Sequence, residues 1–290
     1  MKPEIIFVTG KGGVGKSTVA ASLALKKSKA GLQTLLVEIG DQSFYKDFFH
    51  LPQVGYQPTL IQPKLSVALW TGQSCLREYI IHLIKVETLY KLFFENAVMK
   101  AFVNVAPALP ELAIMGKATS GPRNHGPKLP YDCIVIDSFA TGHFLALMGA
   151  AAGMAEAVKF GPMGEQSRSI DKVLKDPNVC QYYVVCLPEE LPVRETEELY
   201  EQLKNTYGIK PNIILNKAIE SAVSAGEFKA AEKSDSQEFK NFVSEQKLLQ
   251  ASRSEFKKRL EQLGGKVEVL PEIWDHEEQN VLEQLAMRIT

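Results

Sequence analysis

A glycine-rich loop that carries two lysines is the stretch of this sequence best suited to chemistry. Residues 10–17 fit the pattern G-x-x-x-x-G-K-[ST], with Gly10, Gly15, Lys16 and Ser17 at its fixed positions. Glycine lets the backbone approach a ligand, so that successive N–H groups can converge on phosphate oxygens. In such loops the lysine reaches the β- and γ-phosphates and the hydroxyl binds Mg²⁺. The predicted phosphate-binding residues are Gly12, Gly13, Val14, Gly15, Lys16, Ser17 and Thr18.

The elements around this loop are those that the pattern needs. Residues 5–8 form an apolar, β-branched run, which is typical of a buried parallel strand. Residues 17–29 carry apolar side chains at helical spacing, and the positive end of that helix would face the loop. A glycine-rich turn that binds nothing is the alternative interpretation, and the flanking strand and helix argue against it.

A second strand ends in an acidic residue. Residues 131–137 read Tyr-Asp-Cys-Ile-Val-Ile-Asp, with an apolar run that ends at Asp137. The carboxylate of Asp137 would lie where it can bind Mg²⁺ directly or through water. Thr141, Gly142 and His143 follow a few residues later. A capping turn without a chemical role is the alternative interpretation of these three residues.

Together these motifs resemble a known family of dimeric ATPases. The loop Lys-Gly-Gly-Val-Gly-Lys-Ser-Thr, with Lys11 at its start, is similar to the deviant Walker A loop of the arsenite-pump, tail-anchored-protein targeting, Min and partition ATPases and of the nitrogenase iron protein. Asp137 with Thr141-Gly142-His143 resembles the second switch of the arsenite-pump and targeting branch. The resemblance implies that Lys11 contacts the phosphates of ATP in a closed dimer, often across the interface. The residues themselves indicate only that a cation there would stabilise transferring charge.

The first switch departs from that family. The resemblance implies an aspartate after the strand at residues 33–39, where it would orient the attacking water. Better-known members have an Asp-Pro-Ala-His type of sequence, whereas this chain has Glu-Ile-Gly-Asp-Gln. Asp41 is the candidate catalytic residue, Glu38 is the other, and an aspartate in a turn before a helix is the alternative interpretation. Because that aspartate would orient the attacking water, the departure affects the expected rate of ATP hydrolysis.

Two residues near the C-terminal strands complete the predicted nucleotide site. Asn216 follows the strand at residues 211–215, and Pro271 follows the strand at residues 266–270. The resemblance implies that Asn216 reads the adenine base and that Pro271 belongs to the adenine loop. An asparagine has a paired donor and acceptor, which suits a base edge, although it could also serve only a turn.

The order of the elements predicts an α/β fold. Seven strand candidates alternate with helices, which favours one doubly wound, mostly parallel sheet of seven to eight strands in a single domain over residues 1–290. Residues of about 74–125 have apolar side chains at helical spacing and are predicted to form a helical insertion subdomain. Packing against the sheet is one interpretation of this apolar surface, and a groove for a client is the other. Residues 218–263 are polar and predict a solvated helical pair.

Composition narrows the choice of partners and compartment. The chain has 290 residues and a formal net charge of −1, so there is no general electrostatic attraction to nucleic acid. The four cysteines are scattered along the chain and form no C-x-x-C pair. We therefore expect no zinc site and no arsenite-binding cluster of thiolates. Two of them, Cys133 and Cys186, lie in apolar strand-like runs and are expected in the core. The sequence shows no signal-peptide pattern, and we expect a reducing, cytoplasmic setting.

The resemblance implies a Mg²⁺-dependent ATPase that closes as a dimer on binding ATP. No internal repeat is visible, so we expect one ATPase half that pairs with a second copy or with a paralogue. Its protein client or membrane-protein partner is not indicated by the sequence. A nucleotide-gated binding switch or adaptor with little hydrolysis is the alternative, and the divergent first switch favours it.

Overall fold

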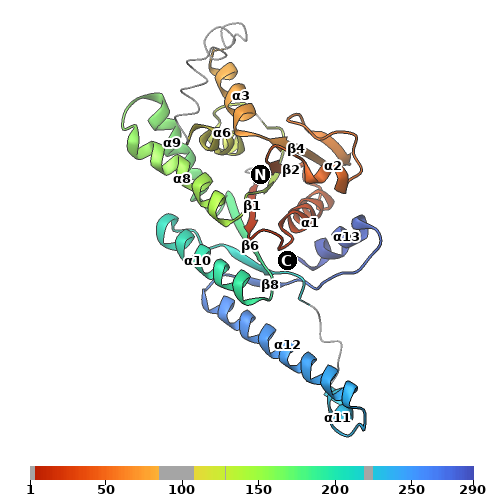
Figure 1. Ribbon diagram of the computed structural model, residues 1–290. Helices are drawn as coiled ribbons and strands as arrows, with labels where there is room; N and C mark the ends of the chain where they lie inside the picture. Colours follow the sequence, from red (N-terminus) through yellow and green to blue (C-terminus); the bar gives the residue numbers. More distant parts are fainter. Residues whose placement is uncertain (1–3, 85–107, 128, 219–224) are drawn as a thin grey trace.

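An eight-stranded sheet of order β3-β4-β2-β5-β1-β6-β7-β8 runs through the computed structural model (Figure 1). The structure describes residues 4–84, 108–127, 129–218 and 225–290. All neighbouring strands in this sheet are parallel except β3 and β4. The predicted fold class is therefore confirmed. The strands are β1 (Glu4–Gly10), β2 (Thr34–Ile39), β3 (Thr59–Gln62), β4 (Leu65–Trp70), β5 (Cys133–Asp137), β6 (Cys180–Cys186), β7 (Asn212–Leu215) and β8 (Val267–Val269).

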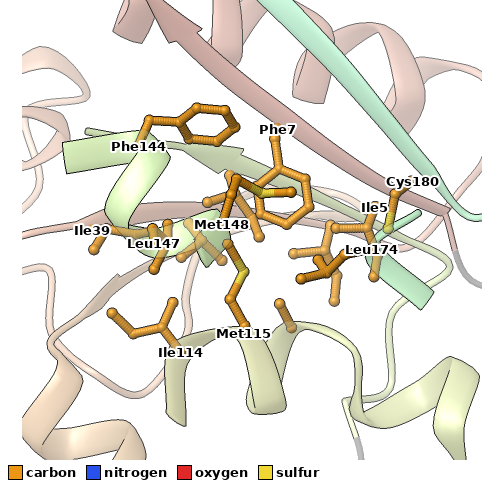
Figure 2. Close-up of a cluster of buried hydrophobic side chains, with 14 of the residues drawn as sticks. Ile5, Phe7, Ile39, Ile114, Met115, Phe144, Leu147, Met148, Leu174 and Cys180 are labelled. Atoms are coloured by element: carbon orange, nitrogen blue, oxygen red, sulfur yellow. The ribbon is translucent and has the colours of Figure 1, made fainter. Parts of the chain in front are cut away.

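The apolar strands are buried because helices cover both faces of the sheet. On one face, Ile6 and Val8 of β1 pack in a cluster with α1 (Lys16–Lys29), α2 (Phe44–Phe48) and α13 (Glu278–Arg288). On the other face, Phe7 packs in a cluster with α6 (Leu109–Ala118), α8 (Thr141–Ala157), α9 (Gly161–Leu174) and α10 (Glu190–Tyr207). Figure 2 shows Phe7 beside Met148, with Phe144 on the same side of the sheet and Met115 of α6 below.

Helices separate β4 from β5, where the helical insertion was predicted. Among the described residues they are α3 (Gly72–Ile84), α6 and the short α7 (Ser120–Arg123). α3 and α6 touch closely, since a Cβ atom on Gly72 would lie 2.3 Å from the Cβ atom of Pro110. Residues 85–107 of the predicted insertion lie outside the described residues. The division into one domain with an insertion at 74–125 stays a prediction.

The polar segment near the C-terminus forms α11 (Ala225–Glu232) and the long α12 (Gln237–Gln262). Both extend away from the sheet in Figure 1, as a solvated helical pair would. α12 is fixed to the body at its C-terminal end, where Leu260 is buried and Arg259 binds Glu190 and Glu197 of α10. No helix in the described ranges combines the length and apolarity needed to cross a lipid bilayer.

Two short elements were absent from the sequence prediction. β3 is an antiparallel edge strand of four residues whose side chains are half-buried or exposed, so it carries no long apolar run. α2 has five residues and begins after Ser43, whose hydroxyl accepts a hydrogen bond from the Lys46 N–H group. Both lie on the β2 side of the sheet, and α2 bears directly on the site described next.

Candidate nucleotide site

The glycine-rich loop connects the central strand β1 to α1, and its backbone geometry requires glycine. Gly10 has φ 145°, and a Cβ atom there would lie 2.2 Å from the carbonyl oxygen of Val185 in β6. Gly15 has φ 90° and immediately precedes α1, and a Cβ atom there would lie 2.5 Å from Asn216 Nδ2. Since a side chain at either position would meet strain and a close contact, the loop can take this path only with glycine.

The N-terminus of α1 faces the loop with uncapped backbone N–H groups. No side chain caps this end, and the first turn contains no acidic residue. The first N–H groups of a helix have no partner within the helix and lie at the positive end of its dipole. This end of α1 is therefore suited to an anion such as a phosphate group.

The two lysines of the loop make different contacts. Lys16 Nζ donates a hydrogen bond of 3.0 Å to the backbone carbonyl oxygen of Lys11. Burial lowers the pKa of Lys16, an effect that the nearby Asp137 carboxylate opposes. Lys11 Nζ lies 2.6 Å from Glu195 Oε1 of α10, and both side chains are about one-third exposed. The loop thus presents one lysine inside the site and one at its edge.

Asp137 ends β5 as a buried carboxylate beside the loop. Its Oδ2 atom accepts a hydrogen bond of 3.1 Å from the Tyr45 hydroxyl, which also lies 2.9 Å from the backbone oxygen of Ser17. Its Oδ1 atom is buried and has no hydrogen-bond partner among the described residues. The pKa of Asp137 is raised to about 6, mainly by burial. Interactions with Ser17 and Tyr45 favour the ionised form and offset part of this effect.

These residues fit a Mg²⁺ ion. Mg²⁺ prefers oxygen ligands and is commonly held by one or two protein oxygens together with waters and substrate phosphates. The unpartnered Oδ1 atom of Asp137 and the adjacent Ser17 side chain supply two such oxygens. In the described part of the chain, no three His, Cys, Asp or Glu side chains gather around one metal position. The arrangement therefore suits a metal that is bound mainly through its nucleotide.

The two first-switch candidates differ in their exposure to solvent. Glu38 pairs across the sheet with Asp137 and is largely buried. Its carboxylate accepts hydrogen bonds from the Ser43 hydroxyl at 2.7 Å and from the Phe44 N–H group at 2.8 Å, so it caps α2. Asp41 is exposed in the turn that precedes α2. The water-orienting role of Asp41 stays a prediction.

Asn216 and Pro271 lie at the ends of neighbouring strands. Asn216 is buried, and its side-chain amide donates a hydrogen bond of 2.9 Å to the Val14 carbonyl oxygen of the loop. Pro271 follows Leu270, whose N–H group bonds to the carbonyl oxygen of Leu215 at the end of β7. The structure thus brings Asn216 to the phosphate loop itself, a contact that the sequence did not predict. The adenine-reading roles stay predictions.

The predicted second switch begins α8. Thr141 is half-buried in the first turn, whereas Gly142 and His143 are exposed. The rings of His143 and Phe139 lie with their centroids 5.8 Å apart. Thr9 of β1 donates a hydrogen bond of 2.8 Å to the Phe139 carbonyl oxygen, which ties the start of this segment to the strand that carries the loop.

Sequence reasoning missed two residues that contact the site. Tyr45 is fully buried between the loop and Asp137, and Glu195 binds Lys11 from α10. Tyr45 lies in an aromatic run after Ser43, and an N-cap residue before such a run is a signal for a short helix. Glu195 is one of several glutamates in an amphipathic helix, so nothing in the sequence distinguishes it.

A phosphate loop between a central parallel strand and a helix, with an acidic residue at the end of the adjacent strand, defines the class of P-loop nucleoside triphosphatases. A sequence profile of the anion-transporting ATPase family matches residues 3–161 and 156–248. The chain belongs to this family.

Individual relatives agree with that assignment. ATPase BagA of Mycobacterium tuberculosis is 32% identical over 224 residues, which cover 73% of this chain and 64% of BagA. A putative arsenical pump-driving ATPase of Halobacterium salinarum is 29% identical over 72% of this chain and 34% of its own length. ATPase get3 of Schizosaccharomyces pombe is 24% identical over 74% of this chain and 73% of its own length. The matched part of the chain thus spans less than two thirds of the first two relatives.

Proposed function

We propose that this chain binds and hydrolyses ATP with Mg²⁺ and that ATP closes it into a dimer. The observation that carries the proposal is the buried Asp137, whose Oδ1 atom has no partner among the described residues, beside Ser17 and Lys16 at the base of the phosphate loop. A buried acceptor without a partner is costly to maintain. Binding of a metal–nucleotide complex would remove this cost.

Different groups of the site would bind different parts of the Mg²⁺–triphosphate complex. The backbone N–H groups of residues 12–18 and the N-terminus of α1 would bind phosphate oxygens. Lys16 would exchange its bond to the Lys11 carbonyl oxygen for the β- and γ-phosphates. Ser17 and Asp137 would hold Mg²⁺, which when bound neutralises charge on the β- and γ-phosphates.

Closure of a dimer would complete the site with Lys11. Lys11 lies at the edge of the loop and is about one-third exposed, so a partner's nucleotide can reach it. We propose a homodimer, with pairing to a paralogue as the other form. The γ-phosphate would hold the segments around Asp41 and Asp137 and release them after hydrolysis. This change would be coupled in the cytoplasm to a protein client or to a membrane-protein partner.

Arsenite is not proposed as an effector. All four cysteines are free and buried. Among the described residues, no three His, Cys, Asp or Glu side chains are grouped so that they could hold a metal ion. Burial raises the pKa values of Cys75, Cys133, Cys180 and Cys186 to about 12. Arsenite needs thiolate ligands, so these side chains are poorly suited to bind it.

A binding switch with little hydrolysis is the second candidate function. Glu38 is tied to the N-terminus of α2 by two hydrogen bonds, and Asp41 is exposed. In this candidate function, neither carboxylate would serve as the water-orienting base. Such a protein would bind ATP and close, but it would turn over slowly.

Substitution of Lys16 tests the site. The experiment compares ATP binding and phosphate release in the wild type and in Lys16→Ala, with Lys29→Ala at the exposed far end of α1 as the control. We expect Lys16→Ala to lose hydrolysis and Lys29→Ala to keep it. Normal turnover in Lys16→Ala would refute the site. Tight ATP binding by the wild type without turnover would favour the binding switch.

A further inference from the structure

Lys11, which the proposed function assigns to the phosphates, is bound to a residue outside the loop. Its Nζ atom lies 2.6 Å from Glu195 Oε1, which is within hydrogen-bonding distance. The two residues are 184 positions apart in the chain. Among the described residues, Glu195 takes part in no other ion pair. The inference that follows rests on the proposed function, because it concerns what Lys11 must leave in order to reach a nucleotide.

Glu195 is held on a rigid support. Val193 and Thr196, which lie on either side of it in α10, are both buried. On the outer side of the same helix, Arg259 of α12 lies 2.8 Å from Glu190 and 2.8 Å from Glu197. The backbone of Glu195 is therefore fixed to the sheet and to α12, and it cannot follow Lys11 if the lysine moves.

The backbone of Lys11 is also engaged, since its carbonyl oxygen accepts the bond from Lys16. If Lys16 turned toward a phosphate, that bond would be lost, and the backbone of Lys11 would lose this constraint. The Lys11 ammonium group then has two competing anions, the Glu195 carboxylate and the triphosphate. It has one charge and a short reach, so binding to one weakens binding to the other.

We propose that Glu195 is a positioning residue that holds Lys11 on α10 and thereby sets the ATP concentration at which the protein closes. Removing the carboxylate should favour the ATP-bound, closed form. Partly exposed ion pairs alter an equilibrium by about two- to fivefold. This contribution should shrink as salt screens the pair.

The test compares Glu195→Gln with Glu198→Gln, a matched change on the same helix whose carboxylate pairs only with the exposed Arg194 in the described structure. The probe is a fluorescent, nonhydrolysable ATP analogue with Mg²⁺, and the readout is the analogue concentration for half-maximal binding and dimer formation. We expect Glu195→Gln to lower this concentration about two- to fivefold at low salt. We expect Glu198→Gln to leave it unchanged.

Analogue binding alone, measured for Glu195→Gln and Glu198→Gln in a Lys11→Met background, separates the contact from a general charge effect. In that background Glu195→Gln should have no further effect, because the group that Glu195 holds is gone. An effect of equal size there would overturn the proposal, since the carboxylate would then act on the nucleotide directly. An unchanged midpoint for Glu195→Gln beside an intact Lys11 would also overturn it.

A readout without nucleotide distinguishes this proposal from the proposed function. Mass spectrometry can follow labelling of Lys11 by an amine-reactive reagent in the full chain. Glu195→Gln should label Lys11 faster than the wild type and Glu198→Gln should not, whether or not the protein binds ATP. Failure of the wild type to bind the analogue would refute the proposed function, whereas equal labelling in all three proteins would refute the Lys11–Glu195 contact.

Discussion

Replacing Asp137 with asparagine should stabilise the protein while abolishing the proposed Mg²⁺-dependent ATPase activity. Burial raises the pKa of Asp137 from an ordinary value of 3.8 to about 6. The folded protein therefore holds a proton on this group more tightly than the unfolded chain does. Above pH 6 the group is ionised in both forms, and its ionisation then disfavours the folded form by about 3 kcal/mol. Below pH 3.8 the group is protonated in both forms, and this penalty is absent.

Asparagine removes the buried charge but adds an amide whose N–H groups need partners. An unsatisfied buried donor costs about 1–3 kcal/mol, so we expect a net gain of about 0–2 kcal/mol in the free energy of unfolding at pH 7.5. The assay is urea unfolding of wild type and Asp137→Asn in metal-free buffer with a chelator, at pH 7.5 and again near pH 4.5. The gain should be largest at pH 7.5 and should shrink toward pH 4.5.

Two results would contradict the predicted effect of Asp137→Asn. Asp137→Asn could be less stable than the wild type at pH 7.5, which would mean that the carboxylate is favourable where it lies. The stability difference could also be the same at both pH values, which would mean that it does not arise from ionisation. ATP turnover of the variant, measured in parallel with Mg²⁺, should be lost in either case, because Asp137 is a proposed metal ligand.

Two further substitutions test the loop and its support. Gly15→Ala should lower both stability and nucleotide affinity, by about 1–3 kcal/mol in stability, because φ is 90° and the new Cβ atom would meet Asn216. Gly12→Ala has open space around its Cβ position and should change the unfolding temperature little. Tyr45→Phe keeps the ring but removes the hydroxyl that contacts Asp137 and Ser17, so it should cost about 1 kcal/mol in stability. It should also raise the pKa of Asp137 further and shift Mg²⁺-dependent turnover to higher Mg²⁺ concentrations at pH 6–7.

A different result would contradict the prediction for each of these substitutions. Equal unfolding temperatures for Gly15→Ala and Gly12→Ala would show that the loop relaxes around a side chain. An unchanged Mg²⁺ dependence in Tyr45→Phe would show that the Tyr45 hydroxyl acts on packing alone. Thermal unfolding supplies the first comparison, and Mg²⁺ titration of turnover supplies the second.

Local sequence patterns were sufficient for most of the fold. The runs at residues 5–8 and 133–137 are strands because their side chains are buried on both faces of the sheet. The glycine pattern likewise indicated the turn into α1, since the backbone path at Gly10 and Gly15 admits no side chain. By contrast, β3 and α2 are short and partly exposed, so they leave weak periodic signals.

The contacts of the site could not be read from the sequence because they join distant positions. Tyr45 reaches Asp137 across 92 positions, and Asn216 reaches Val14 across 202. Each contact depends on how the strands order themselves in the sheet, which no local pattern encodes. Asn216 illustrates the difference, since its residue type suggested a base contact and the structure places its amide on the phosphate loop.

In the proposed function, ATP bound at this site closes the chain into an active dimer. The most direct test measures molar mass by light scattering together with phosphate release, in Mg²⁺ with ADP, with ATP and with a nonhydrolysable analogue. We expect a monomer with ADP, a dimer with the analogue and steady turnover with ATP. A protein that stays monomeric in all three conditions and releases no phosphate would contradict the proposed function.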